Sequence, residues 1–432
     1  MTPTTTAGTN QTSARPIDVN AAEHDPQETT MRVLIADKFE AAGIEAMARL
    51  GCQVELQPEL TADTLGAAIA GHDPDVLIVR STRVNEAAIE SGKALSLIIR
   101  AGAGYDTIDV AAASARGVFV ANCPGKNSIA VAELVWGLIL ACDRRIPDQT
   151  AELRAGTWNK KEYAKARGLY GKTLGILGLG QIGLEVAARG RAFGMRVVAW
   201  SRRLTQEKAD ALGVGFMSHP INLAKVSDVI SVNVAATGET ANLIDESFCS
   251  AMQSGAYLIN TSRGSVVDET ALTKAIREKG IRAGLDVFAG EPGGGTGEFK
   301  SPIVGEPGVY GTHHVGASTD QAQLAIAEEA VRILEEYSST GEVPNCVNRA
   351  ATTAATILLT VRHLNKPGVL AHVFYTLGQA GINVEEMENI IYDEAKAACA
   401  RIQLDDMPGE EHLKTIGANE HVLSVTLAKI RK

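Results

Sequence analysis

The sequence predicts an α/β fold: two doubly wound domains, Rossmann-like or flavodoxin-like, followed by a small ferredoxin-like module. Short apolar runs alternate with helix-length amphipathic stretches from residue 31 to about residue 340, which is typical of parallel sheets covered by helices. One glycine-rich turn of the form GxGxxG follows an apolar run directly, as in dinucleotide-binding domains. Beyond residue 356 the order of strand-like and helix-like segments changes to β-α-β-β-α-β.

These changes divide the chain into five parts, because 432 residues exceed what one hydrophobic core holds. We expect a disordered tail at 1–30, a substrate-binding domain made of 31–127 and 318–345, a dinucleotide-binding domain at 128–317, a linker at 346–355 and a regulatory module at 356–432.

The elements of the first two domains can be taken in order. In the first domain, RVLIAD at its start is a buried strand, FEAAGIEAMARLG is a helix that Gly51 closes, and three further apolar runs are strands: VLIVR, LSLIIRAG and GVFVANC. A long helix from about Ser128 to Arg145 and a polar stretch lead to the second domain. Its strands are TLGILG, RVVAWS, DVISVNV, AYLINTS and AGLDVF, and a helix from about Asp320 to Tyr337 returns to the first domain.

The C-terminal module repeats none of this pattern. TILLTVRH, INVEEMENIIYD, KAACARIQLDD and HVLSVTLAKI are strand-like, whereas GVLAHVFYTLGQAG and EEHLKTIG are helical.

Composition excludes several classes of protein. The net charge is -10 and no Lys/Arg-rich run is present, which argues against nucleic-acid and membrane-surface partners. No apolar stretch approaches the ~20 residues of a membrane span, and the N-terminal segment lacks the apolar core of a signal peptide. The six cysteines lie far apart without metal-ligand spacing, so we expect no metal site and reduced, mainly packing thiols in the cytoplasm.

The glycine-rich turn predicts a dinucleotide site. Gly178, Gly180 and Gly183 frame Gln181 and Ile182 between a strand and a helix, where a pyrophosphate can approach the backbone. Such sites usually carry an acid at the end of the next strand to bind the ribose. Here that strand ends in Ser201, Arg202 and Arg203, which predicts NAD with NADP as an open alternative. Both arginines can equally be solvated surface residues.

Three later segments provide groups for hydride chemistry. Oxidation of an alcohol needs a proton acceptor, usually a histidine supported by a carboxylate, and a cation for the substrate carboxylate. Arg263 in INTSRGSVVD, Glu291 in GLDVFAGEP and His314 in THHVGAST each follow a strand of the second domain. Each also has a plain structural interpretation, as a surface ion pair, a turn residue or an exposed histidine.

Together these motifs resemble the D-isomer-specific 2-hydroxyacid dehydrogenase family, most closely the members that oxidise 3-phosphoglycerate in the first step of L-serine biosynthesis. The resemblance covers Met31 to the C-terminus. It implies that Arg263 binds the substrate carboxylate, that Glu291 pairs with His314, and that His314 is the general acid/base. It further implies cofactor contacts for the remaining candidates, Thr261 and Asp286.

The same resemblance assigns the substrate phosphate and carboxylate. In the first domain VRST, GKNS and RAGAG match the family's substrate loops, which implies phosphate contacts for Arg80, Ser81 and Asn127 and backbone contacts with the carboxylate at Ala103 and Gly104. Arg80 can alternatively form an ordinary ion pair at the end of a strand.

The C-terminal module resembles an ACT domain, an amino-acid-binding module. His363, Asn365 and Asn383 match the positions that bind L-serine in serine-inhibited members, which implies an L-serine effector; the alternative is a dimerisation module that binds nothing. Because ACT domains commonly pair between subunits, we expect a homodimer or homotetramer.

Two rival functions stay open from the sequence. WSRR favours an NADPH-dependent glyoxylate or hydroxypyruvate reductase, and a dinucleotide-sensing corepressor or scaffold keeps the same arginine, glutamate and histidine. Three positions depart from the family pattern. Ser201 for the usual acid and Asn233 for a histidine bear on the choice of cofactor, and His313 for a proline bears on which histidine acts; the spacing to VGAST favours His314.

Overall fold

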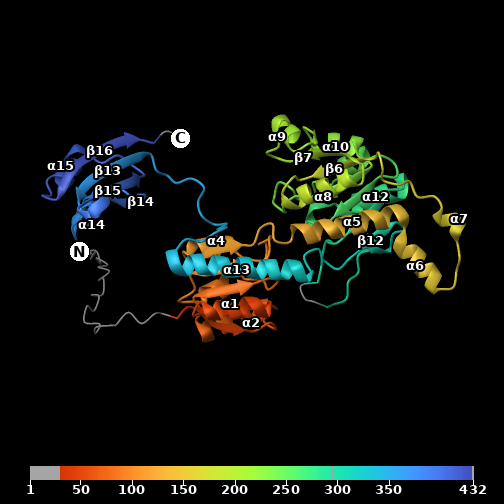
Figure 1. Ribbon diagram of the computed structural model, residues 1–432, viewed down its shortest axis with the longest axis horizontal. Coiled ribbons are helices and arrows are strands. Elements are labelled where there is room, and N and C mark those ends of the chain that lie inside the picture. Colours follow the sequence, from red (N-terminus) through yellow and green to blue (C-terminus); the bar gives the residue numbers. More distant parts are fainter. Residues whose placement is uncertain (1–29, 293–295, 431–432) are drawn as a thin grey trace, which may run out of the picture. The chain divides into compact units, whose positions relative to one another are not determined.

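The computed structural model describes residues 30–292 and 296–430, so the tail expected at 1–30 lies outside the described residues except for its last position. The chain divides into two compact units, Met1–Asn348 and Arg349–Lys432. The first contains two parallel sheets and the second one antiparallel sheet (Figure 1).

The first sheet has five parallel strands in the order β2-β1-β3-β4-β5, which is the flavodoxin-like arrangement. The bounds are β1 Arg32–Ile35, β2 Gln53–Leu56, β3 Val76–Val79, β4 Leu97–Arg100 and β5 Phe119–Asn122. Four of these strands are almost wholly buried, because helices cover both faces of the sheet. The covering helices are α1 Ala41–Arg49 and α13 Asp320–Thr340 on one face, and α2 Ala62–His72, α3 Glu86–Glu90 and α4 Val110–Ala115 on the other.

The second sheet has seven parallel strands in the order β12-β11-β10-β9-β6-β7-β8, as in a Rossmann domain. The bounds are β6 Thr173–Leu177, β7 Arg196–Trp200, β8 Gly215–Phe216, β9 Val229–Val232, β10 Tyr257–Asn260, β11 Arg282–Leu285 and β12 Val309–Gly311. One face packs on α5 Ser128–Arg144, α8 Gln181–Ala192 and α9 Gln206–Ala211, and the other on α10 Pro220–Val226, α11 Glu246–Ala251 and α12 Glu269–Lys279. The predicted α/β class is therefore confirmed.

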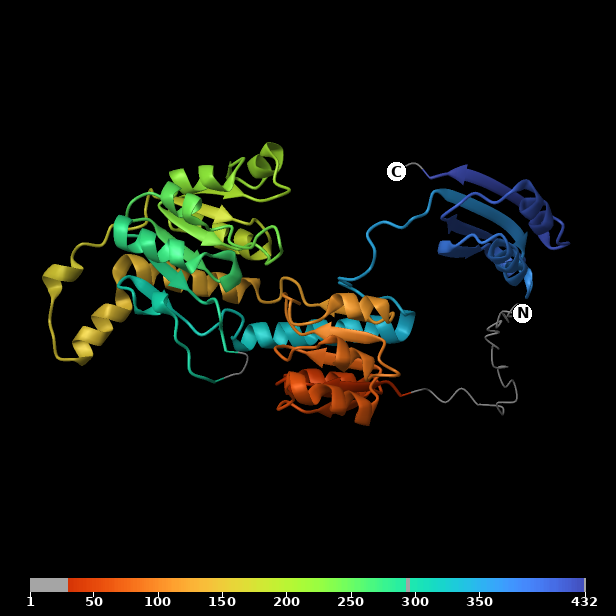
Figure 2. The same ribbon diagram turned by 180° about the vertical axis from the view of Figure 1, so that it is seen from behind.

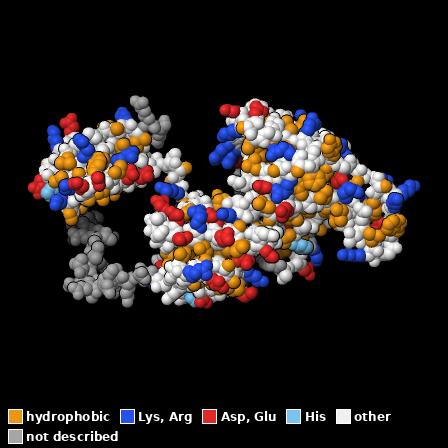
Figure 3. Space-filling model, viewed as in Figure 1, with side chains coloured by type: hydrophobic (Ala, Val, Ile, Leu, Met, Phe, Trp, Pro, Cys, Tyr) orange, Lys and Arg blue, Asp and Glu red, His pale blue; other side chains and the backbone are white. Residues whose placement is uncertain are grey.

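An arm between α5 and β6 was not predicted as helical. It contains α6 Ile146–Arg154 and α7 Lys160–Tyr163, and no residue of either helix is buried. Ile146, Leu153 and Trp158 are exposed on this arm, and Figure 3 shows hydrophobic side chains gathered there. The arm thus offers an apolar surface within the first unit.

The segment 345–348 closes one edge of the first sheet. Cys346 bridges to Ala121 of β5 in antiparallel fashion, and the N–H of Val347 donates to the Val120 carbonyl at 2.8 Å. The Asn348 side chain accepts from the Val120 N–H at 2.9 Å. Chain that precedes the second unit therefore completes the hydrogen bonding of an edge strand.

The second unit has the predicted order β-α-β-β-α-β (Figure 2). Its elements are β13 Ile357–Leu364, α14 Val369–Gln379, β14 Val384–Ile391, β15 Ala397–Leu404, α15 Glu410–Gly417 and β16 Val422–Lys429. The antiparallel sheet has the order β14-β15-β13-β16, and both helices pack on one face of it. This agrees with a ferredoxin-like module.

No helix in the described part of the chain is long and apolar enough to cross a bilayer. Within residues 30–292 and 296–430 there is also no cluster of three or more His, Cys, Asp or Glu side chains that could hold a metal ion.

Candidate active site

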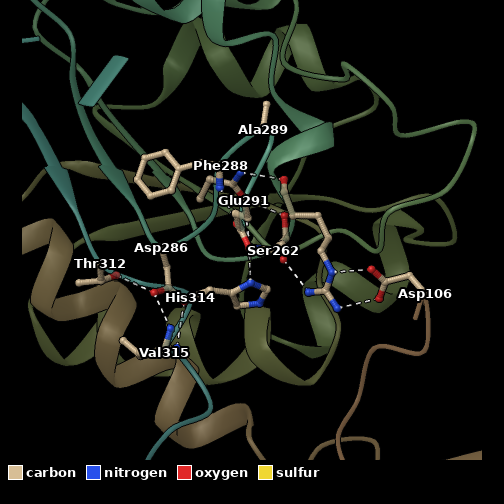
Figure 4. Close-up of polar contacts among 12 residues, drawn as sticks. Asp106, Ser262, Asp286, Phe288, Ala289, Glu291, Thr312, His314 and Val315 are labelled. Atoms are coloured by element: carbon tan, nitrogen blue, oxygen red, sulfur yellow. Dashed lines mark hydrogen bonds and ion pairs between the residues drawn. The ribbon is translucent and has the colours of Figure 1, made fainter. Parts of the chain in front are cut away.

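A histidine and a carboxylate form the centre of the site. Nδ1 of His314 lies 2.7 Å from Oε2 of Glu291, and Oε1 of Glu291 accepts the Phe288 N–H at 2.7 Å (Figure 4). Burial disfavours ionisation of Glu291, but the hydrogen bonds from His314 and Phe288 and the charge of Arg263 hold the pKa of its carboxyl below the ordinary value. The carboxylate therefore stays charged and can stabilise an imidazolium, while Nε2 is the nitrogen available to a substrate.

The backbone conformation of His314 is set by Asp286. His314 has φ +53°, which is uncommon for a residue with a side chain. The buried carboxylate of Asp286 accepts from the Thr312 hydroxyl at 2.6 Å and from the N–H groups of Val315 and Gly316 at 2.9 Å each. The Asp286 carbonyl also accepts the His314 N–H at 2.8 Å. Asp286, expected to contact the cofactor, thus also anchors the loop that carries the histidine, a role that sequence reasoning missed.

Arg263 forms an ion pair that the sequence did not indicate. Its Nε and Nη2 atoms lie 3.1 and 2.9 Å from the two carboxylate oxygens of Asp106, and Nη1 donates to the Ser262 carbonyl at 2.7 Å. Asp106 follows β4 of the first sheet and Arg263 follows β10 of the second, so the pair joins loops from both sheets.

Arg100, at the end of β4, is a second arginine that the sequence did not single out. Its Nε atom is buried, and the described residues offer it no hydrogen-bond partner. Burial and the nearby charge of Arg263 lower the pKa of Arg100 to about 10, and Asp106 opposes this. A buried cation with an unused donor points to an anionic ligand.

Two glycines of RAGAG make room for these guanidinium groups. A Cβ at Gly102 would lie 1.7 Å from Nη1 of Arg100, and one at Gly104 would lie 2.1 Å from Nη2 of Arg263. The Ala103 carbonyl accepts from the Asn122 side chain at 2.6 Å. The loop that we expect to offer backbone contacts to a substrate therefore also lies against two guanidinium groups.

Arg80 and Ser81 lie on the adjacent loop, after β3. The backbone N–H groups of Arg80, Ser81 and Thr82 all donate to Oδ2 of Asp37, at 2.7, 3.0 and 3.1 Å. Burial lowers the pKa of Arg80, and the charges of Asp37 and Glu40 oppose this effect. The Asp37 carboxylate thus holds the backbone of this loop in place.

Asn127 stands at the start of α5 and does not cap it. Its side chain makes no capping hydrogen bond, and its buried Oδ1 lacks a partner within the described chain. An unsatisfied acceptor at a helix start is consistent with a ligand-facing position.

The glycine-rich turn passes a test of fit for a dinucleotide. A Cβ at Gly178 would lie 2.7 Å from the Asn233 carbonyl oxygen, and one at Gly183 would lie 2.3 Å from the Gly178 carbonyl oxygen. A Cβ at Gly180 would meet no described atom within 4 Å. Two glycines are thus required by the fold itself, whereas Gly180 leaves the open approach that a pyrophosphate at the start of α8 needs.

The remaining cofactor candidates lie at the start of α8 and after β7 and β10. Gln181 and Ile182 open α8, and Thr261, after β10, is buried. Ser201 follows β7 as expected, whereas the exposed guanidinium of Arg202 pairs with the exposed carboxylate of Glu239. An exposed pair of this kind contributes little stability and can be exchanged for a ligand phosphate.

One copy of the second unit does not bring the three effector candidates together. His363 is buried, with Nδ1 2.8 Å from the Leu364 carbonyl and Nε2 3.3 Å from Oδ1 of Asn389. Asn365 is exposed and donates to the Ala395 carbonyl at 3.1 Å. Asn383 precedes β14 at the opposite end of the sheet: His363 pairs with Ala398 and Val384 with Leu404, six residues or about 20 Å apart along β15.

Comparison with known proteins agrees with this site. Residues 136–316 match the NAD-binding domain of D-isomer specific 2-hydroxyacid dehydrogenases. A D-3-phosphoglycerate dehydrogenase from Methanocaldococcus jannaschii is 39% identical over 310 residues, covering 70% of this chain and 57% of that protein. A hydroxypyruvate reductase from Thermotoga maritima is 42% identical over 259 residues, covering 60% and 82%.

The chain is also similar in fold to solved structures of 2-hydroxy-acid enzymes. The NADPH-dependent glyoxylate/hydroxypyruvate reductase of Sinorhizobium meliloti, in complex with NADP and malonate, is 28% identical with a TM-score of 0.63, covering 75% of this chain and all of that one. The chain spans between 54% and 60% of the length of the five phosphoglycerate dehydrogenases that it matches first. With the shared motifs, the identities and the geometry together, the chain belongs to the D-isomer specific 2-hydroxyacid dehydrogenase family.

Proposed function

We propose that this protein oxidises 3-phospho-D-glycerate to 3-phosphohydroxypyruvate, the first step of L-serine biosynthesis, with a nicotinamide dinucleotide as cofactor. The observation that carries the proposal is a group of three arginines near the His314–Glu291 pair. Arg80 and Arg100 stand at the ends of the neighbouring strands β3 and β4. One loop, at Gly102 and Gly104, lies against Arg100 and Arg263, and the charge of Arg263 acts on Glu291. A substrate with a carboxylate at one end and a phosphate at the other needs cations at two places.

The residues divide the chemistry as follows. Arg263 binds the substrate carboxylate, and Nε2 of His314 removes the proton of the C2 hydroxyl. Glu291, paired with Nδ1, stabilises the resulting imidazolium. The nicotinamide ring, when bound, supplies the acceptor for the hydride from C2. In the reverse direction His314 returns the proton to the carbonyl oxygen.

The phosphate is assigned to the first sheet. We infer that Arg80, with Ser81 and Asn127, binds it as expected from the sequence, and we add Arg100, whose Nε atom is buried and unpartnered among the described residues. Gly104 lies beside Arg263. We infer that its backbone and that of Ala103 complete the carboxylate site, as the sequence leads us to expect.

NAD is the proposed cofactor, and NADP is a second candidate that Ser201 and Arg202 favour. No acid stands at the end of β7 to repel a 2′-phosphate, and Arg202 is paired with the exposed carboxylate of Glu239. Titration of cofactor binding by NADH and NADPH fluorescence separates the two. A preference for NADPH that Arg202→Ala abolishes would establish NADP.

We further propose that the C-terminal module is an ACT domain that binds L-serine and that the protein is a cytoplasmic homo-oligomer. Because Asn383 lies far from His363 and Asn365 in one module, a site that uses all three needs two copies. The apolar arm with Ile146, Leu153 and Trp158 gives a second surface for self-association. Light scattering measures the molar mass and therefore the oligomeric state. The same measurement with L-serine present tests whether the effector changes that state.

Initial rates at the nicotinamide absorbance band test the activity. We expect oxidation of 3-phosphoglycerate with a kcat/KM well above that for reduction of hydroxypyruvate or glyoxylate. The opposite ranking would establish a reductase, and binding of dinucleotide without turnover of any 2-hydroxy acid would favour a sensing protein.

A further inference from the structure

The guanidinium group of Arg263 is restrained on several sides. Asp106 holds its Nε and Nη2 atoms at 3.1 and 2.9 Å, the Ser262 carbonyl accepts from Nη1 at 2.7 Å, and the backbone of Gly104 lies against Nη2. The side chain thus has one defined orientation, although it is 28% exposed. An arginine side chain without such contacts populates many rotamers. These contacts therefore hold the guanidinium group in this orientation.

The contacts leave one part of the fork for a ligand. A guanidinium carries five N–H donors, and the three hydrogen bonds above use one each on Nε, Nη1 and Nη2. One donor is left on each of Nη1 and Nη2. These two nitrogens form the end of the fork, which matches a carboxylate in a paired arrangement.

Asp106 remains charged in this position. The hydrogen bond from Arg263 and the charges of Arg263 and Arg100 outweigh partial burial and lower the pKa of its carboxyl. One carboxylate between two guanidinium groups also offsets their mutual repulsion, which otherwise pushes Arg263 away from Arg100. Because Asp106 is 53% exposed, the pair itself contributes little to stability.

We propose that Asp106 is a positioning residue for substrate recognition: it binds one edge of the Arg263 fork so that the Nη1 and Nη2 end faces the carboxylate of a 2-hydroxy acid. This inference rests on the proposed role of Arg263. Asp106 then helps Arg263 to bind the substrate carboxylate and does not compete with that carboxylate for the guanidinium group. Because the loops of Asp106 and Arg263 follow strands of different sheets, this contact orders the carboxylate site only when both loops are in place.

The test compares Asp106→Asn with a matched control, Asp109→Asn. Asp109 lies three residues away on the same loop, and its side chain accepts the Ala112 N–H at 3.0 Å as the cap of α4. Asparagine caps helices as well as aspartate does, so the control removes the same charge and keeps the fold. The probe is oxalate, which carries carboxylates and no phosphate, titrated by calorimetry into the full-length protein saturated with reduced cofactor.

We expect Asp106→Asn to weaken oxalate binding by ~10-fold, because Arg263 then loses the charge-assisted contact that orders its side chain before the ligand binds. It should raise the KM for 2-hydroxy acids with a smaller change in kcat. The melting temperature and cofactor affinity should stay at wild-type values, and Asp109→Asn should match the wild type throughout. A merely structural role for Asp106 would change melting and cofactor binding together.

Unchanged oxalate affinity in Asp106→Asn would overturn the proposal, and so would tighter binding, which would make Asp106 a competitor. Failure of the proposed function appears elsewhere, as a wild-type protein that does not oxidise 3-phosphoglycerate. The oxalate titration is independent of that result, because every 2-hydroxy acid of this family carries the carboxylate.

Discussion

His314 and Glu291 are joined by a hydrogen bond of 2.7 Å between Nδ1 and Oε2, although 22 residues separate them in the chain and they follow different strands. This relationship fixes which ring nitrogen faces the carboxylate. It leaves Nε2 to exchange a proton with a ligand.

The first prediction concerns this pair. His314→Asn should lower kcat by ~10²-fold or more, the usual worth of general acid/base catalysis. His313→Asn is the matched control, because His313 is an exposed neighbour, and it should retain near-normal turnover. Stopped-flow and steady-state rates with saturating cofactor measure both. Retained activity in His314→Asn, or its loss in His313→Asn, would remove His314 from the mechanism.

The second prediction separates the glycines of the turn. Gly180→Ala should leave the melting temperature unchanged and weaken NADH binding by about tenfold or more, because the added Cβ enters only the space for the pyrophosphate. Gly183→Ala should instead destabilise the fold by ~1–3 kcal/mol, since its Cβ would overlap the Gly178 carbonyl. Calorimetric melting and fluorescence titration test the pair. Unchanged cofactor affinity in Gly180→Ala would contradict the proposed binding site.

The third prediction concerns phosphate recognition. Arg80→Ala should reduce kcat/KM for 3-phosphoglycerate by ~10- to 100-fold and for unphosphorylated 2-hydroxyglutarate far less, because one charge-assisted contact to phosphate is lost. Arg83→Ala removes the same charge from an exposed position on the same loop and should affect neither substrate. Equal losses for both substrates in Arg80→Ala would show that Arg80 does not bind the phosphate.

The fourth prediction is a pH dependence of stability that arises at Glu329 of α13. This buried carboxylate accepts from Arg332 at 2.7 Å and from Asn345 at 2.8 Å, and it lies 3.1 Å from Lys126. These contacts, with that of Arg332 the largest, outweigh burial and lower the pKa of Glu329 to about 2.

The direction of this pH dependence follows from the difference between the pKa of Glu329 in the folded and unfolded states. The unfolded carboxyl has a pKa of ~4.3, so the ionised group stabilises the folded state fully above that pH and loses this contribution as pH falls toward 2. Glu329→Gln should therefore cost at most about 3 kcal/mol at pH 7 and progressively less below pH ~4. Urea unfolding at several pH values measures the difference. Exposed Glu335 of the same helix is the control, and an equal pH profile for Glu335→Gln would contradict the prediction.

Local patterns predicted most of the fold. The long helix expected from about Ser128 to Arg145 is α5, Ser128–Arg144, and Gly51 follows the first helix with φ +84°, as a helix-ending glycine should. Three strands were missed. β8 and β12 have two and three residues, too few for a periodic signal. β2, with the sequence QVEL, is a largely exposed edge strand without an apolar run. The helices of the arm were missed because their side chains are largely polar and none is buried.

The sequence predicted the site residues only where a recognisable motif lies within a single loop. The glycine turn and the motifs of Arg263, Glu291 and His314 are local, and the structure brings the latter two into contact. The contact between Asp106 and Arg263 joins residues 157 positions apart. Nothing near Arg100 in the sequence indicated that its Nε atom is buried, because only the fold determines which loops surround it.

The bridge from Cys346 and Val347 to β5 has a practical consequence for work on shortened forms of this protein. A shortened version that stops before residue 345 would strip the cover from β5 and leave an open strand that recruits other chains, whereas one that stops after Asn348 would keep the edge sealed. Aggregation of the first version and monodisperse behaviour of the second would locate the shortest form of the first unit that is stable in solution without the second unit.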